Sequence, residues 1–193
     1  MKAMRLTLVL FAAAAVLSVA ASAAPVPEVV QEGPVTVTKV QSPKKELRME
    51  VRVPGTRDAV WQAFTTTEGL NSWLWKDCAV DLRKGGSWIV NFPGGKTGGG
   101  TIEKFKRGSE IRMHAMAPEQ FPTVRSVGTT AVFQFQAVGD TATIVRLVQT
   151  GWQKGEEWDN AYAYLAKGNA QLLAQLQRRF VNGPMNWEAA AGH

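Results

Sequence analysis

The chain is poor in the side chains that most often perform catalysis, bind metals or form disulfides. Its 193 residues include one cysteine, Cys78, and two histidines, His114 and His193, which are far apart. A single cysteine cannot form an internal disulfide, and two distant histidines lack the spacing of a metal site. No serine stands in a Gly-x-Ser-x-Gly elbow, so nothing supports a serine hydrolase of that kind. We expect no metal and no cofactor, and interpret Cys78 as a small buried apolar residue rather than a reactive thiol.

Charge of one sign is not concentrated in any part of the chain. The formal net charge is +6, from 22 lysines and arginines against 16 aspartates and glutamates, and the two signs are interleaved. Proteins that bind nucleic acids usually gather basic residues on one face or in one run. A nucleic-acid partner is therefore not expected, and the length suits one domain with a sizeable core.

The first residues have the pattern of an export signal. Lys2 and Arg5 form a short basic segment, residues 6–19 are apolar and uncharged, and a small-x-small site ends at Ala23. The apolar run is shorter than the ~20 residues that span a bilayer comfortably. We expect a signal peptide over residues 1–23, cleavage after Ala23, and a periplasmic or secreted protein. The alternative is an uncleaved N-terminal anchor.

Alternating hydrophobicity predicts mostly β-strands after this leader. Leu47, Met49, Val51 and Val53 are separated by charged residues, which is typical of a strand with one buried and one solvated face. Thr56 is a good N-cap for a short helix. The predicted elements are an edge strand at 35–40, strands at 47–53, 79–83, 87–92, 101–106, 111–116, 129–137 and 141–149, and short helices at 58–64 and 65–74.

Two segments between the strands are predicted to be loops. Residues 93–100 contain Gly95-Lys96-Thr97, which resembles part of a phosphate-binding loop. The P-loop needs a glycine where this chain has Val90, and a helix after the loop, whereas a strand is predicted to follow. We therefore predict a flexible hairpin turn here, and a longer loop at 117–128.

The last predicted element is a long amphipathic helix over residues 156–180. Its apolar residues recur at helical spacing and form one stripe, made of Trp158, Tyr162, Leu165, Leu172, Leu176 and Phe180. Asn169 is the polar interruption of the stripe. Gly183 and Pro184 then stop the helix. A stripe of this length has to lie on an apolar surface, and only a sheet face is available.

The order of these elements favours an α+β fold. We predict a curved antiparallel β-sheet wrapped around the long C-terminal α-helix, with two short helices after the first strand. Such a sheet often leaves a cavity between itself and the helix. We expect residues 45–182 to form this domain, after an extended N-terminal segment at 24–44 and before a loosely ordered tail at 183–193.

Several motifs in this region carry a family resemblance. They are Val51-Arg52-Val53-Pro54, Val60-Trp61-Gln62-Ala63-Phe64-Thr65-Thr66, Glu68-Gly69-Leu70-Asn71-Ser72-Trp73, Val80-Asp81-Leu82-Arg83-Lys84-Gly85-Gly86, Thr150-Gly151-Trp152, Glu157-Trp158 and Tyr162-Ala163-Tyr164. Over residues 47–180 the chain resembles the SRPBCC (START-like) superfamily. More narrowly, it is similar to homologues of the activator of the ninety-kilodalton heat-shock protein ATPase. The resemblance implies a helix-grip fold with a hydrophobic cavity between the sheet and the C-terminal helix.

Two features set this chain apart from that family. Relatives typically have tryptophan after the glycine of the long helix, whereas here Asn169 follows Gly168. An amide in place of a ring would enlarge the cavity and give it a donor and an acceptor. The alternative is that Asn169 lies in solvent at a sheet edge. The export signal also argues against the family's eponymous activity, because that chaperone is intracellular and needs ATP.

The candidate ligand-binding residues are mainly aromatic, because aromatic side chains offer large apolar faces to a ligand. The candidates are Trp88, Phe92, His114, Phe133, Phe135, Trp158, Tyr162, Leu165 and Asn169. For each tryptophan the alternative is simple core packing. His114 and Arg112 share one strand face, and Glu103 lies on a neighbouring strand. These three are the weak candidates for acid–base catalysis, and the alternative is a solvated face.

Three functions are compatible with this pattern. The sequence favours a non-catalytic protein that binds a small hydrophobic or amphipathic molecule, with transient membrane contact as a further expectation. The second is a cyclase- or aromatase-like enzyme that uses His114, Arg112 or Glu103. The third is an envelope chaperone-like interaction module, which would need an exposed apolar patch. The pattern does not predict an oligomeric state.

The export signal generates a first test. Protein recovered from the periplasm of a bacterial host is expected to begin at Ala24, because signal peptidase cuts after a small-x-small site. Intact mass measurement of the periplasmic fraction checks this. A full-length chain retained in the membrane fraction would instead establish the uncleaved anchor.

Overall fold

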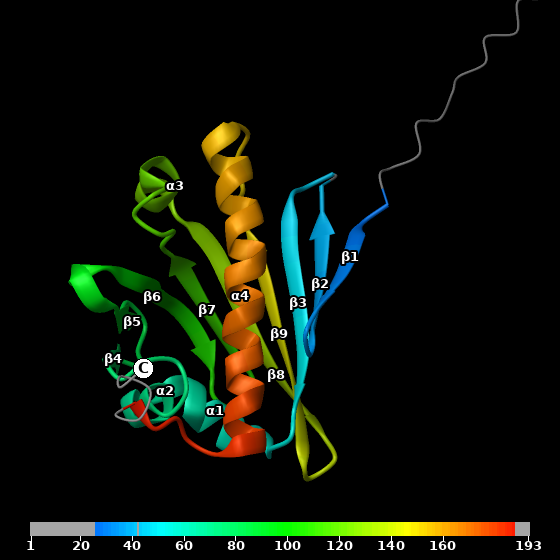
Figure 1. The fold of residues 1–193 in the computed structure, drawn as a ribbon, viewed down its shortest axis with the longest axis vertical. Coiled ribbons are helices and arrows are strands. Elements are labelled where there is room, and N and C mark those ends of the chain that lie inside the picture. The colour runs from blue at the N-terminus through cyan, green and yellow to red at the C-terminus, as the bar shows by residue number, and fades with distance from the viewer. Residues whose placement is uncertain (1–25, 42, 188–193) are drawn as a thin grey trace, which may run out of the picture.

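The computed structural model describes residues 26–41 and 43–187, so the expected signal peptide and its cleavage site lie outside the described residues. One antiparallel sheet of nine strands has the order β1-β2-β3-β9-β8-β7-β6-β5-β4 (Figure 1). The strands are β1 Glu28–Glu32, β2 Val35–Val40, β3 Glu46–Val53, β4 Cys78–Val80, β5 Ser87–Asn91, β6 Thr97–Lys106, β7 Glu110–Ala115, β8 Thr129–Val138 and β9 Ala142–Thr150. The helices are α1 Arg57–Thr65, α2 Thr67–Asn71, α3 Pro122–Val127 and α4 Glu156–Asn182, with a 3-10 turn at Pro93–Gly95. Within these residues, no helix has the length and apolarity to cross a membrane.

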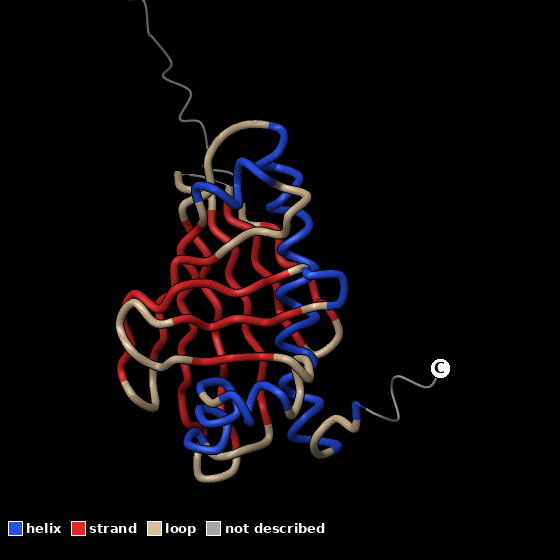
Figure 2. Tube along the Cα trace, turned by 90° about the vertical axis from the view of Figure 1, so that its left-hand side faces the viewer, coloured by secondary structure: helices blue, strands red, loops and turns tan. Residues whose placement is uncertain are grey.

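The sheet curves around α4, which confirms the predicted helix-grip architecture. In Figure 2 the strands nearest the viewer run across the direction of those behind them, and α4 lies along the sheet. Alternation sets the two faces: in β3, Leu47, Met49, Val51 and Val53 are buried and the charged residues between them are exposed. The register pairs Leu47 with Gln149 of β9, which places the inner faces of both strands under the helix.

The prediction that residues 35–40 form an edge strand is wrong. β2 is an interior strand because β1 pairs with its outer side, from Glu28 opposite Lys39 to Glu32 opposite Val35. Val35 and Val37 are fully buried. The predicted strand at 35–40 is thus present as β2, and the segment expected to contain one strand contributes two strands to the same sheet.

The two short helices follow β3 as predicted, and threonines set their bounds. The Thr56 hydroxyl accepts a hydrogen bond from the amide of Ala59 at the start of α1. Thr66 has extended backbone angles, so it ends α1, and its hydroxyl caps α2 through the amide of Gly69. This break makes α2 shorter than the predicted helix at 65–74.

Both predicted loops contain regular structure. The turn after β5 is limited to Pro93–Gly95, and β6 begins at Thr97, so the three glycines at 98–100 lie in a strand. A Cβ at Gly99 would lie 1.9 Å from the carbonyl oxygen of Trp88, and one at Gly100 2.3 Å from that of His114. Only glycine fits such close backbone approach. The predicted loop at 117–128 contains α3.

The long helix α4 packs mainly on β2 and β3. The residues that it buries in the main core include two alanines, Ala166 and Ala170, together with larger side chains. Small side chains allow a helix to approach a sheet closely. Leu165 and Leu172, which belong to the predicted stripe, are only half-buried. The helix therefore sits against one flank of the sheet and overhangs the other.

The segment after α4 is packed on α2 up to residue 187. The amide of Met185 donates to the carbonyl oxygen of Ser72, and the Trp187 indole N–H donates to that of Asn71. The rings of Trp187 and Trp75 lie 5.3 Å apart. Residues 183–187 are thus not loose, and the remainder of the predicted tail lies outside the described residues.

Two helical glycines give a matched test of this packing. A Cβ at Gly168 in α4 meets nothing within 4 Å, whereas one at Gly69 in α2 would lie 2.3 Å from the carbonyl oxygen of Gln62. Gly168→Ala is expected to raise the free energy of unfolding by about 0.5–1 kcal/mol, because alanine has the higher helix propensity. Gly69→Ala is expected to lower it by about 1–3 kcal/mol through overpacking. Urea denaturation checks both, and equal shifts would contradict the described contacts.

Candidate functional site

A cavity of about 750 Å³ lies between the sheet and the overhanging side of α4. Strands β5–β9 supply one wall, and Leu165, Asn169 and Leu172 of α4 supply the opposite wall. The volume is in the range of pockets that hold small organic ligands. The cavity therefore lies between the sheet and the helix, as the sequence predicted, on the flank where α4 overhangs the sheet.

The cavity interior is predominantly apolar. Its apolar lining consists of Leu74, Trp88, Val90, Phe92, Met113, Ala115, Met116, Pro118, Ala131, Phe133, Leu147, Leu165 and Leu172. Met113 and Met116 have flexible, polarisable side chains that adapt to different ligand shapes. Gly98 and Gly99 present only backbone to the cavity. A ligand here would be held chiefly by burial of its apolar surface.

Two amides form the polar part of the inner wall. Asn169 Nδ2 donates to Gln149 Oε1 at 2.9 Å, and Gln149 Nε2 donates to Thr129 Oγ1 at 2.7 Å. Gln149 is only 3% exposed, so its side chain needs these partners. The alternative that Asn169 lies in solvent at a sheet edge does not hold. Its side chain is half-buried, lines the cavity and is hydrogen-bonded.

The charged residues of the lining lie at the solvent side of the cavity. Lys96 and Glu119 are exposed, and so is the neutral Gln120. Phe92 and Tyr164 are 39% and 48% exposed. We define these five residues as the mouth of the cavity. Within the described chain, Lys96, Glu119 and Tyr164 are the only ionisable side chains in the lining, so the interior has no fixed charge.

The helix α3 is fastened beside the mouth by two charged side chains. Arg125 Nη2 donates to Thr97 Oγ1 at 2.8 Å, and Nη1 donates to the carbonyl oxygen of Ala117 at 2.6 Å. Glu157 of α4 accepts a hydrogen bond from the amide of Val124 at 3.0 Å. Hydrogen bonding, first to the Thr123 side chain and then to the Val124 amide, lowers the pKa of the Glu157 carboxyl. α3 is thus joined to both walls of the cavity.

Five of the predicted ligand-binding residues line the cavity, and they come from both of its walls. They are Trp88, Phe92, Phe133, Leu165 and Asn169. The Trp88 indole N–H donates to the carbonyl oxygen of Phe64 at 3.0 Å, so its ring presents an apolar face while its polar edge is satisfied. Phe92 lies at the mouth and the others lie farther in.

Phe135 and Trp158 lie outside the cavity. Phe135 points to the same face of β8 as Phe133, but Trp61 and Phe64 of α1 cover it, each with its ring 5.4 Å away. Trp158 belongs to a separate apolar cluster that joins α3 to the start of α4, made of Ala117, Phe121, Val124, Trp158 and Ala161. Both are core residues, which was the alternative for the aromatic candidates.

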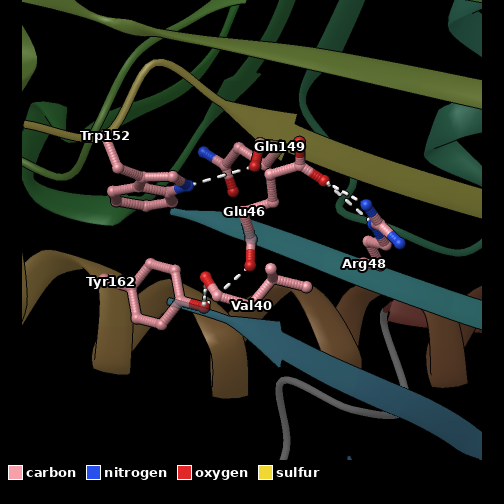
Figure 3. A network of polar contacts seen from close by, with 6 residues as sticks. All are labelled: Val40, Glu46, Arg48, Gln149, Trp152 and Tyr162. Atoms are coloured by element: carbon pink, nitrogen blue, oxygen red, sulfur yellow. Dashed lines mark hydrogen bonds and ion pairs between the residues drawn. The ribbon is translucent and has the colours of Figure 1, made fainter. Parts of the chain in front are cut away.

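Tyr162 also lies outside the cavity, on the flank of α4 that faces β2 and β3 (Figure 3). Its hydroxyl lies 2.7 Å from the carbonyl oxygen of Glu46, to which it donates, and 3.4 Å from that of Val40. Burial raises the pKa of Tyr162 to about 12, which keeps the phenol protonated and able to donate. Figure 3 shows this contact beside the bond from the Trp152 indole N–H to the carbonyl oxygen of Gln149. Tyr162 fixes the helix on the sheet and does not contact a ligand site.

The three acid–base candidates do not line the cavity. Arg112 Nε donates to Glu103 Oε2 at 2.9 Å, and both side chains are 40% exposed on the outer face of the sheet. His114 is exposed on the same strand, next to Gly128. The inward residues of that strand are Ile111, Met113 and Ala115, so its alternation sends His114 the other way. His114, Arg112 and Glu103 therefore lie on a solvated face of the sheet, which was the alternative to a role in acid–base catalysis.

Cys78 is buried and its thiol donates to the carbonyl oxygen of Trp75 at 3.2 Å. Burial raises the pKa of the thiol to about 11. The thiolate, which is the reactive form, is therefore scarce near neutral pH. No group of three or more potential metal ligands occurs among residues 26–41 and 43–187.

Four residues that line the cavity were not among the predicted site residues: Met113, Ala131, Leu147 and Gln149. A signal for Gln149 was present. It shares the inward phase of β9 with Val145 and Leu147, so alternation alone places this polar side chain on the buried face. Tyr164 and the segment at 116–120 carried no comparable signal, because their position depends on how α3 folds over the mouth.

Comparison with known proteins agrees with this architecture. A family model described as "Activator of Hsp90 ATPase homolog 1-like protein" matches residues 54–180. That match begins after β3 and ends near the end of α4, so it includes most of the cavity walls. No curated protein matches the chain.

Solved structures with the same fold come from several bacteria. The Aha1 dimer of Colwellia psychrerythraea is 20% identical, with a TM-score of 0.58 over 72% of this chain and 97% of that one. A protein of Mesorhizobium loti is 14% identical, with a TM-score of 0.61 over 72% and 99%. CalU16 of Micromonospora echinospora is 16% identical, with a TM-score of 0.55 over 86% and 91%. Identities this low support the fold alone.

The bond from Glu157 to α3 generates a pH-dependent prediction. The pKa of the Glu157 carboxyl is lower in the folded state than in the unfolded state, where it is about 4.5. Such a carboxyl stabilises the fold at pH values above its unfolded pKa. The stabilisation is lost as pH falls through the folded pKa. Glu157→Gln is expected to lower stability slightly at pH 7. The difference from the unmodified chain should shrink as pH falls below 4.5 and vanish once pH is below the folded pKa.

The matched control is Glu156→Gln, which removes a neighbouring charge in the same helical turn without touching α3. Urea denaturation at pH 7 and at acidic pH provides the comparison. A Glu157→Gln deficit that stays constant down to acidic pH would show that the carboxylate charge does not hold α3.

Proposed function

The chain belongs to the Activator of Hsp90 ATPase homolog 1-like protein family, and from that premise we propose that it is an exported protein that binds a small hydrophobic or amphipathic molecule. The proposed site is the cavity between the sheet and α4. The proposed activity is binding and release, without a chemical step.

The observation that carries the proposal is the apolar volume of about 750 Å³ inside an otherwise close-packed domain. Protein interiors normally leave few voids larger than a water molecule, because empty space forfeits dispersion contacts. Phe133, Leu147 and Trp88 are buried and border this space. A ligand would supply the missing contacts.

The position of the ionisable residues supports binding over catalysis. Among residues 26–41 and 43–187, the charged side chains of the lining are confined to the mouth of the cavity, while His114, Arg112 and Glu103 lie on the outer face. General acid–base catalysis needs the catalytic group within hydrogen-bonding reach of the reacting atoms. An enzyme that uses these three residues would need its substrate on the solvated side of the sheet.

Export and membrane contact belong to the proposal as well. The leader pattern at residues 1–23 supports export, and the exposed rings of Phe92 and Tyr164 at the mouth support transient contact with a membrane from which an apolar ligand is taken. Aromatic side chains with a polar tip, such as tyrosine, are favoured at membrane interfaces.

Filling the cavity tests the proposal. Native mass spectrometry of protein purified from the periplasm is expected to show a bound apolar molecule, and phenanthrene, a compact three-ring hydrocarbon, is expected to quench the fluorescence of Trp88. Leu165→Trp places a ring inside the cavity and should weaken phenanthrene binding by on the order of tenfold or more, since pockets reject groups that overfill them.

Gln175→Trp is the matched control, because Gln175 is exposed on the same helix and does not line the cavity. It should bind phenanthrene like the unmodified chain. Equal binding by both tryptophan variants would place the ligand elsewhere on the protein. No binding of phenanthrene to the unmodified chain, together with a bare mass in the spectrometer, would refute the proposed function.

A further inference from the structure

We infer that the ligand is a neutral, largely apolar molecule with one hydrogen-bond donor, a hydroxyl or an N–H, that bonds to Oδ1 of Asn169. This inference rests on the proposed function and specifies the chemical class of the ligand. Asn169 becomes the specificity-determining residue of the cavity.

The hydrogen bonds of the inner wall couple the orientation of Asn169 to that of Gln149. Its Nδ2 is used by Gln149 Oε1, and Gln149 Nε2 is used in turn by Thr129 Oγ1. Turning Asn169 alone would bring its oxygen against the Gln149 oxygen, and two acceptors repel. In the arrangement that the structure shows, Oδ1 of Asn169 is the amide atom left to accept, and it has no hydrogen bond to another described residue.

Asn169 is also placed to meet a ligand. It lies between Leu165 and Leu172 on the cavity side of α4, near the middle of the helix, and its side chain is half-buried. An amide oxygen in an apolar cavity is costly to leave without a partner once water is displaced. A ligand that supplies a donor at this point avoids that penalty, whereas a pure hydrocarbon does not.

The other polar groups of the lining restrict the ligand to one such donor. The Thr97 hydroxyl accepts a bond from Arg125, and Lys96, Glu119 and Gln120 lie at the exposed mouth. No cation of the described chain faces the interior, so a buried carboxylate or phosphate would be unpaired. A ligand with polar groups at several positions would likewise bury some of them without partners.

Three related compounds test whether Asn169 Oδ1 accepts a hydrogen bond from the ligand. Phenanthrene has no polar group, 9-methoxyphenanthrene can only accept a hydrogen bond, and 9-phenanthrol can donate one. We expect 9-phenanthrol to bind about fivefold more tightly than phenanthrene, the ratio that corresponds to one neutral hydrogen bond. The methoxy compound should show little of this gain. Titration followed by tryptophan fluorescence gives all three dissociation constants.

Asn169→Leu should abolish the preference while retaining phenanthrene binding, because leucine keeps the wall apolar and of similar size. Asn169→Ala is the second variant, in case the first does not fold, and should lose the preference in the same way. Gln171→Leu removes an amide from the exposed side of the same helix and should leave the fivefold ratio unchanged.

The outcomes separate this inference from the function on which it rests. Equal binding of all three compounds to the unmodified chain, or a preference that survives Asn169→Leu, overturns the role of Asn169 and leaves the cavity as a binding site. Tighter binding of the methoxy compound shows that the amide chain runs in the reverse direction and overturns the assignment of a donor. Failure of every compound to bind overturns both proposals.

Discussion

The close docking of α4 on β2 and β3 is the contact on which the rest of the structure depends. Ala166 and Ala170 give the helix a small-residue face, and the Tyr162 hydroxyl ties it to the backbone of β3 at Glu46. Because the helix packs against this flank of the sheet, the cavity separates its other side from β5–β8. The cavity is thus a consequence of asymmetric packing rather than of missing core residues. The position of the helix also decides which side of Asn169 meets the ligand space.

Much of the fold could be predicted because its signals are local. The alternation in β3 and the hydroxyl of Thr56 act over a few residues, and both features appear in the structure as expected. β1 could not be predicted, because none of its residues is buried and it is a strand only through its pairing with β2. α3 was not predicted, because it has no capping side chain of its own. Its first turn is stabilised instead by Glu157, a residue of another helix.

The site was less predictable than the fold, since periodicity identifies a face but not what covers it. Phe133 and Phe135 share one face of β8, yet Phe133 borders the cavity and Phe135 is covered by α1. The same is true of α4. Leu165 and Tyr162 belong to one predicted apolar stripe, yet Leu165 lines the cavity and Tyr162 docks the helix on the sheet. Only the lateral offset of α4 distinguishes these residues, and that offset is a property of the assembled domain. Gln149 is the exception. Its position could have been predicted, because the alternation of β9 places its side chain on the buried face of the sheet.

The glycines of β6 divide the cavity into a part that tolerates sequence change and a part that does not. A side chain at position 99 or 100 would collide with the backbone of a neighbouring strand, so the wall there is built from peptide groups whose chemistry is the same in every protein. The opposite wall is a helix surface, where Leu165, Asn169 and Leu172 project into open space. A lineage that carries this domain can therefore acquire a new ligand by substitutions on one helix while the sheet stays fixed. The glycine stretch of β6 is the part of the wall that resists substitution, and the exposed surface of α4 is a part that can change.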